Sequence, residues 1–280
     1  MKHFLRTITL LGIITAGSLM TNAQQVNTLY FLENAPMRHT INPAIQPVQS
    51  FYMAFPAIGY TSAWLGNYDM TLNSWVYKNK AGQMVSAEAW NKLPNMIMLD
   101  EDATINIFSV GWAVRERGFF HINATERLTS TMRAPKAIFS GDMNEDIFIN
   151  DKFNVISSSA YAEVAFGYSH YINEQWTVGA KAKLLLGHGF MDATVDDFTF
   201  RSSADEVSLV ANGTLREAGI MRDLIEHNFG DHTWSYLMPS GYGAALDLGV
   251  TYKPIEMVQV SAAVTDLGFI KWTGQLGKGK

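Results

Sequence analysis

Apolar and polar residues alternate along several stretches of the chain, most regularly over residues 175–186. One side of this stretch carries only apolar side chains, and the other is almost wholly polar or glycine. A period of two residues predicts a β-strand, because successive side chains point to opposite faces. The length suits a tilted strand of about 9–11 residues that crosses the hydrocarbon core of a membrane. The apolar side consists of Trp176, Val178, Ala180, Ala182, Leu184 and Leu186.

The same alternation recurs in pairs of segments joined by short turns. This arrangement predicts an antiparallel all-β fold built from hairpins. Residues 51–72 form one further extended segment, which is long, irregular and interrupted at Pro56 and Gly66. The paired segments are 104–114 with 118–128, 160–169 with 175–186, and 242–251 with 258–265.

The connections between these segments alternate in length. Turns near residues 116, 173 and 255 are short, whereas the other connections are long. Short turns on one side and long loops on the other are typical of outer-membrane barrels. We therefore predict an antiparallel transmembrane β-barrel over residues 50–280, with short periplasmic turns, long external loops and minor helices. The long loops are 73–103, 129–157 and 187–240; within them we expect helices at 87–93, 135–139 and 215–228, and a polar hairpin over 191–210.

The pattern yields about seven crossing strands, whereas bacterial single-chain barrels have even numbers. Two explanations are open. The one that we favour is that the chain is a fragment, incomplete at its C-terminus, whose remaining strands are missing. The other is that one strand escapes the analysis, for example if residues 51–72 form a hairpin instead of a single segment.

Residues 1–23 have the three parts of an export signal. A basic start is followed by a short apolar run, Ile8–Leu19, and small residues lead up to Ala23. The apolar run is too short to span a bilayer, so we expect cleavage after Ala23 instead of anchoring. The expected location is the outer membrane.

Residues 24–49 are neither strand-like nor helical throughout, and they contain three prolines. One hypothesis is that this segment, including Asn42 and Pro43, plugs the lumen at the periplasmic mouth. The other is that it forms an ordered leader packed beneath the barrel. The sequence does not favour either hypothesis.

The composition favours a membrane barrel and excludes several kinds of functional site. Aromatic residues make up 12% of the 280 residues and charged residues only 17%, whereas a soluble protein usually has about 25% charged residues. The absence of cysteine excludes a thiolate nucleophile, an iron–sulfur cluster and a lipoprotein anchor. The formal net charge of −5 argues against a nucleic-acid partner.

Four ionisable residues, Glu163, Lys181, Lys183 and Asp247, fall on the polar sides of the predicted strands. In a barrel these sides face the lumen, where charges can pair or contact water. The functional interpretation is a lumen that filters or binds a polar solute. The structural interpretation, which we favour, is mutual pairing that fills a narrow barrel.

Other candidate chemistry is weak. Residues 142–146 have the opening spacing of a calcium loop, but Ile147 and Phe153 stand where the loop needs glycine and glutamate. His188 could be combined with Ser157–Ser159, or with Ser202 and Asp205, yet no motif supports such a site. We predict no catalytic residue, no metal site and no cofactor.

Several short sequence motifs are similar to those of known proteins. They resemble a family of unknown function found in outer-membrane proteins of Bacteroidota. The word Asn42-Pro43-Ala44 is also similar to barrels of the long-chain fatty-acid transporter type and to outer-membrane components of the type IX secretion system. The resemblance implies location and architecture but no catalytic residue. These motifs are Thr28–Pro36, Ile41–Pro47, Ala134–Lys136, Leu248–Pro254 and Asp266–Trp272.

We therefore expect a channel, a hydrophobic-solute transporter or an envelope assembly scaffold without catalysis. Its partners would be outer-membrane lipid and other envelope or secretion proteins. The main alternative is a secreted soluble β-rich binding protein in which the apolar sides form a core. A third is an outer-membrane lipase or protease with its site on the long loops. The first reading requires Phe166, Leu184, Leu246 and Val260 to face acyl chains instead of lying between two stacked layers.

Overall fold

The described residues of the computed structural model form one antiparallel sheet and a short 3-10 helix, η1 (Pro36–Thr40). The prediction of an all-β antiparallel fold is confirmed. The sheet does not close into a barrel within these residues. The structure describes residues 29–30, 32, 34–56, 61–67, 95–136, 147–149, 152–202, 207–221, 238–255, 257–273 and 277–279.

The long strands pair in the order β3-β4-β6-β7; β1 and β2 both pair with β3, β5 pairs with β7, β10 pairs with β9 and β11 pairs with β8. The first part of β7 pairs with β9, and its later part pairs with β8, so β8 and β9 follow one another along the same edge of β7. The strands are β1 (Phe51–Ala54), β2 (Thr61–Asn67), β3 (Met96–Val114), β4 (Gly118–Pro135), β5 (Ile147–Ile149), β6 (Phe153–Tyr171), β7 (Trp176–Ser202), β8 (Val207–Gly219), β9 (Gly241–Ile255), β10 (Val258–Trp272) and β11 (Gly277–Gly279).

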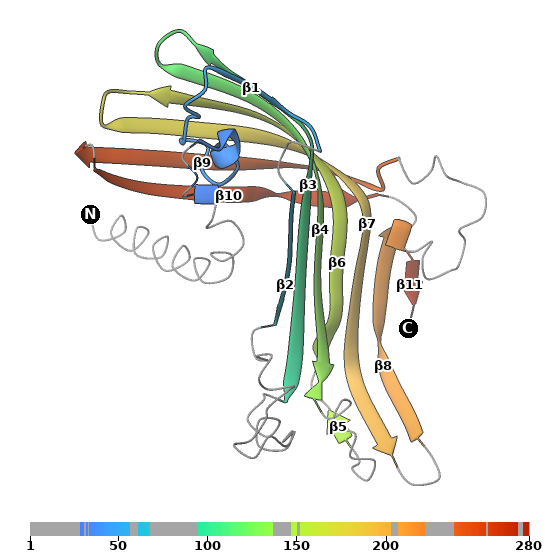
Figure 1. The fold of residues 1–280 in the computed structure, drawn as a ribbon. Coiled ribbons are helices and arrows are strands. Elements are labelled where there is room, and N and C mark those ends of the chain that lie inside the picture. The colour runs from blue at the N-terminus through green and yellow to red at the C-terminus, as the bar shows by residue number, and fades with distance from the viewer. Residues whose placement is uncertain are drawn as a thin grey trace, which may run out of the picture.

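The sheet bends into two halves, and β-bulges lie near the bend. The register shifts after Asn106 in β3 and at His188 in β7. A further shift, after Val264 in β10, lies level with Ala180–Ala182 of β7, within the half that ends in the short turns. A bulge bends its strand and increases the local twist, and Figure 1 shows the long strands β3, β4, β6 and β7 changing direction midway. We call the part that ends in the three short turns the turn half, and the other part the far half.

The two faces of the turn half have opposite character. Residues 34–49, the N-terminal segment, lie against what we call the inner face. The outer face is apolar and open: Phe166, Leu184, Leu246 and Val260 are 57%, 49%, 40% and 59% exposed. No second layer covers these four side chains among the described residues.

Aromatic rings line the outer face next to the short turns. They come from neighbouring strands at nearly the same level, because Trp112 pairs with Phe120 and Phe120 with Tyr168. The centroids of Phe120 and Tyr168 lie 4.5 Å apart, and those of Trp176 and Tyr252 lie 4.4 Å apart. The alternation in sequence therefore places a band of rings at one edge of the apolar face.

The strands are longer than the alternation predicted, so the expected long loops are partly wrong. β3 begins at Met96, β4 runs to Pro135 and β6 begins at Phe153. The expected hairpin over 191–210 is present as the pairing of β7 with β8. Past the bulges the strict apolar–polar alternation fades, although the backbone hydrogen bonds between strands continue. Because the prediction depended on this alternation, it ended each strand too early.

The helix expected at 215–228 is wrong over Leu215–Gly219, which belongs to β8 and pairs with residues 189–193 of β7. The helix expected at 135–139 is wrong at Pro135, the last residue of β4. A long-range ladder satisfies these backbone groups, and local spacing does not reveal it. Residues 1–23, 87–93, 137–139, 142–146 and 222–228, on which other predictions rest, lie outside the described residues.

The described parts of residues 51–72, which are 51–56 and 61–67, contribute one interrupted edge strand, and they do not pair with each other as a hairpin. β1 and β2 both pair antiparallel with β3, which means that they run in the same direction. In the far half, sequence analysis predicted only the first residues of β8, as part of the hairpin over 191–210, and missed the rest of this strand. In the turn half the described strands number seven, as the alternation predicted: β1, β3, β4, β6, β7, β9 and β10.

Across the described part of the chain, the structure contains no helix that is both long enough and apolar enough to span a membrane.

The turn between β6 and β7 yields a first prediction. The Asn173 Oδ1 atom accepts hydrogen bonds from the backbone N–H groups of Gln175 (2.9 Å) and Trp176 (2.8 Å). We expect Asn173→Ala to lower the free energy of unfolding by about 1 kcal/mol, since both donors lose this acceptor. Urea unfolding followed by tryptophan fluorescence measures the change. Glu174→Ala, in the same turn, is the control, and an equal loss in both variants would contradict the assignment.

Candidate functional site

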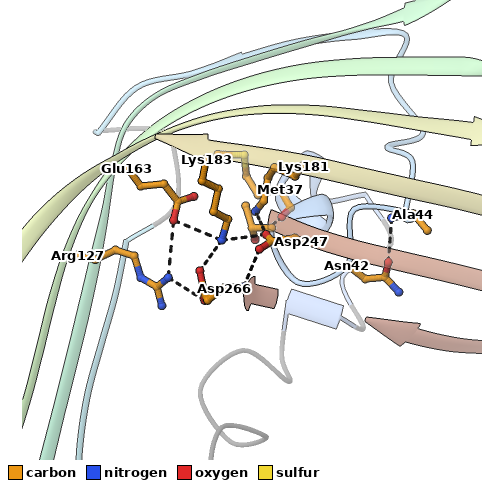
Figure 2. A network of polar contacts seen from close by, with 10 residues as sticks. Met37, Asn42, Ala44, Arg127, Glu163, Lys181, Lys183, Asp247 and Asp266 are labelled. Atoms are coloured by element: carbon orange, nitrogen blue, oxygen red, sulfur yellow. Dashed lines mark hydrogen bonds and ion pairs between the residues drawn. The ribbon is translucent and has the colours of Figure 1, made fainter. Parts of the chain in front are cut away.

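The inner face of the turn half carries six charged side chains from five strands, which we call the charge cluster (Figure 2). At its centre the Lys183 ammonium lies 2.6 Å from Asp266, 2.9 Å from Asp247 and 3.4 Å from Glu163. Lys181 lies 2.8 Å from Asp247. Arg127 lies 3.1 Å from Asp266 and 3.7 Å from Glu163. The structure thus brings all four predicted residues together, and it adds Arg127 and Asp266.

Strand register explains most of this arrangement. Lys181 and Lys183 are two residues apart in β7 and therefore share a face. Lys181 is directly opposite Asp247 in β9, and β6 presents only Gly167 opposite Lys181 and Ala165 opposite Lys183. The small residues leave room for the long lysine side chains. The sequence alternation predicts this face, because it sorts side chains by side.

Asp266 reaches the cluster through a bulge, which is why sequence analysis missed it. Its backbone φ is +59°, in the left-handed region that aspartate adopts more readily than most residues. Its N–H donates to Asp247 Oδ1 at 2.7 Å. The bulge breaks the period of two between Val264 and Leu267. The sequence feature that could have pointed to Asp266 was the motif Asp266–Trp272, one of those that resemble other proteins.

The charges of the cluster balance, with three cations and three carboxylates. The side chains of Lys181, Lys183 and Asp247 are no more than 4% exposed. Removing ions from water costs several kcal/mol each unless they are paired and hydrogen-bonded. Each of these three contacts at least one opposite charge within 3 Å, so the cluster fills the inner face as a set of matched pairs.

The N-terminal segment crosses the inner face beside the charge cluster. The Asn42 amide donates to the carbonyls of Val250 in β9 (3.4 Å) and Ala262 in β10 (3.2 Å). Its Oδ1 accepts the Ala44 N–H at 2.9 Å, as Figure 2 shows. The Asn42 side chain therefore stabilises the turn at Ala44 and also connects the N-terminal segment to two strands.

Two glycines make room for this segment. A Cβ atom at Gly179 would collide with the Pro43 carbonyl, and one at Gly249 would collide with the Asn42 side chain. Neighbouring strands thus present bare backbone where the segment passes. This explains why Asn42 and Pro43 are buried: they lie against β7 and β9, near the end of the sheet that carries the short turns.

A second polar group links the N-terminal segment to the wall, and sequence analysis missed it. His39, in η1, stacks on His121 of β4 with 3.9 Å between ring centroids. His39 Nε2 hydrogen-bonds the Tyr52 hydroxyl, which lies 2.9 Å from Ser109 Oγ. Burial, and then the nearby His121 and Lys181, hold the pKa of His39 well below its usual 6.5. His39 is therefore neutral at pH 7.

His188 does not combine with Ser157–Ser159 into the catalytic arrangement that was considered, whereas Asp205 and the Ser202 side chain of the other arrangement lie outside the described residues. His188 Nδ1 lies 3.0 Å from Glu126 Oε1, while Ser159 pairs with Thr129. The described residues contain no group of three or more His, Asp or Glu side chains placed to hold a metal ion.

Comparison with known proteins gives one match. The profile of a family described as "Family of unknown function (DUF5723)" matches residues 43–278, which is most of the chain. Searches among curated proteins and among solved structures gave no match.

The charge cluster generates a second prediction. We expect Lys183→Met to lower the free energy of unfolding by about 3–5 kcal/mol, because it leaves buried carboxylates without their central cation. Lys152→Met is the matched control: its ion pair with Asp196 is exposed, and exposed pairs add little stability. Denaturant titration of both variants measures the difference. Similar stabilities for the two would show that the cluster is energetically equivalent to a surface pair.

Proposed function

The chain belongs to the DUF5723 family of unknown function, and we propose that it forms the wall of an outer-membrane β-barrel whose lumen is closed at rest by the N-terminal segment. The protein is a transporter without catalytic activity, and its solute passes when this segment moves. The observation that carries the proposal is the opposite character of the two faces of the turn half, one apolar and exposed, the other charged and covered.

The dimensions of the outer face support a membrane location. In β7 the apolar positions run from Trp176 to Leu186, which is 11 residues. At about 3.3 Å per residue and a tilt near 45°, this stretch covers roughly 25 Å along the membrane normal. That is the height of the apolar band of outer-membrane barrels, which is bordered by aromatic girdles. Here the rings of Trp176 and Tyr252 lie at one border.

The inner face supports a closed lumen. The charge cluster and the buried Asn42 and Pro43 occupy the face that lines a barrel of this orientation. An open diffusion pore would leave that face to water. The similarity of Asn42-Pro43-Ala44 to fatty-acid-transporter barrels favours a hydrophobic solute.

The far half supports a second candidate, an assembly scaffold. β7 has 27 residues, far more than a crossing needs, so the proposed barrel carries a wall that projects beyond the bilayer. Such a wall offers a surface for envelope or secretion proteins. The rival soluble binding protein would need a second layer over the outer face, and the rival hydrolase would need a nucleophile beside His188.

A pair of lysine substitutions tests membrane location. We expect Leu184→Lys to abolish assembly in the outer membrane, since a charge on the lipid face near the midplane costs about 2–4 kcal/mol. Val210→Lys, at a 56% exposed position in the far half, should assemble normally. Membrane fractionation and heat-modifiable gel mobility measure the outcome. In the soluble alternative Leu184 would lie in a core, so Leu184→Lys would disrupt that protein as well, and the fraction that holds the native chain and Val210→Lys decides between the two. Recovery of these two proteins from the soluble fraction would reject the barrel.

Conductance in planar bilayers tests closure. We expect low conductance for the native chain and a clear increase for Gly179→Val, whose side chain would displace Pro43. Ala180→Val, on the opposite face of the same strand, should stay closed. A chain lacking residues 24–49 provides a second open form. If neither altered chain conducts more than the native protein, the segment is a structural leader and does not gate the lumen.

A further inference from the structure

The stacked pair of His39 and His121, the imidazole pair, joins the N-terminal segment to the wall through groups that can change charge. We propose that this pair is an acid-sensitive latch: it holds the segment in place while both rings are neutral and releases it when they are protonated. The inference rests on the proposed function, in which the segment closes the lumen. It adds a means of regulating that closure.

Among the described residues, no anion is recorded in contact with the imidazole pair. The described groups that face His39 are the Tyr52 hydroxyl of β1, the His121 ring of β4 and the Lys181 ammonium of β7. Asp247, the carboxylate that pairs with Lys181, is also bound by Lys183. A proton on either ring would therefore add a cation beside a stacked imidazole and a buried ammonium, and like charges at this distance repel.

The neutral state is the one that the surrounding hydrogen bonds satisfy. The Asn123 amide donates to Ser109 Oγ at 2.6 Å. The Ser109 hydroxyl can then donate to Tyr52, and Tyr52 to an unprotonated Nε2 of His39. All donors in this chain point toward His39. Its Nδ1 and both ring nitrogens of His121 are buried without a hydrogen-bond partner among the described residues. Protonation would turn His39 Nε2 from an acceptor of the Tyr52 hydroxyl into a donor, and it would give His121 two unpaired N–H groups instead of one.

Space at the contact is limited, which makes the latch sensitive to small changes. A Cβ atom at Gly167 would collide with the His121 ring, and His39 and His121 are each 1% exposed. Water cannot enter to screen a new charge unless the segment lifts. The electrostatic cost of a protonated ring is therefore not reduced by water, and it disfavours the docked position of the segment.

The direction of the pH effect follows from the pKa of His39, which burial and the neighbouring cations lower from its usual 6.5. The docked segment binds fewer protons than the released segment. Docking is thus at full strength above pH 6.5 and weakens below it, by up to about tenfold for each pH unit from this one group.

The experiment uses the absence of native cysteine. Ile45→Cys places a thiol at a position that is 5% exposed when the segment is docked, and Val48→Cys places one at a position that is 73% exposed. Each full-length variant, purified in detergent micelles, is labelled with a pyridyl disulfide reagent between pH 7.5 and pH 5.0. The ratio of the two rates cancels the pH dependence of the thiol itself.

We expect protonation of His39 to raise this ratio about thirty-fold between pH 7.5 and pH 5.0 in the native background, and we expect a much shallower rise when His39→Gln is added. His121→Gln, a second variant, should make the rise shallower. A flat ratio in the native background, or an equal rise with His39→Gln, would overturn the latch. Either result would leave the barrel intact, because fractionation and conductance at neutral pH test that proposal separately.

Discussion

Pairing of two buried lysines with carboxylates from neighbouring strands is the interaction on which the sheet depends most. Lys181 and Lys183 lie on the same face of β7, and their partners come from β6, β9 and β10. A shift of one residue in any of these registers would turn the charge to the apolar face and leave its partner unpaired. The charge cluster therefore specifies the register of the turn half, and with it the separation of the two faces.

The N-terminal segment completes the inner face by contacts that need no apolar core. Gly179 and Gly249 allow the backbone around Pro43 to approach β7 and β9, and Asn42 bonds to the carbonyls of two strands. The apolar cluster beneath η1 is small, with Met37, Tyr52, Ala54 and Phe119. The segment is held by a few polar contacts and close backbone packing, an arrangement that can be released without unfolding the wall.

Bulges have two different effects in this sheet. Those in β3 and β7 lie near the end of the apolar outer face, where the sheet bends. The bulge in β10 lies level with the middle of that face and carries Asp266 into the charge cluster. In the proposed barrel the first two mark the border of the bilayer, and the third supplies a charge to the interior.

Local alternation in the sequence was enough to predict the all-β class, the three short turns and the four cluster residues Glu163, Lys181, Lys183 and Asp247, because a period of two assigns each side chain to a face. It was not enough where partners are distant or the period breaks. Residues 215–219 of β8 were taken for part of a helix because their ladder partners, residues 189–193 of β7, lie more than twenty residues away. Asp266 was missed because a bulge shifts the phase of β10. Arg127 lies at the end of the predicted segment 118–128, whose alternation is less regular, and His39 lies outside the alternating segments. Which charges meet, and what the N-terminal segment covers, was decided only by the tertiary structure, since both depend on strand register and close backbone approach between residues far apart in the chain.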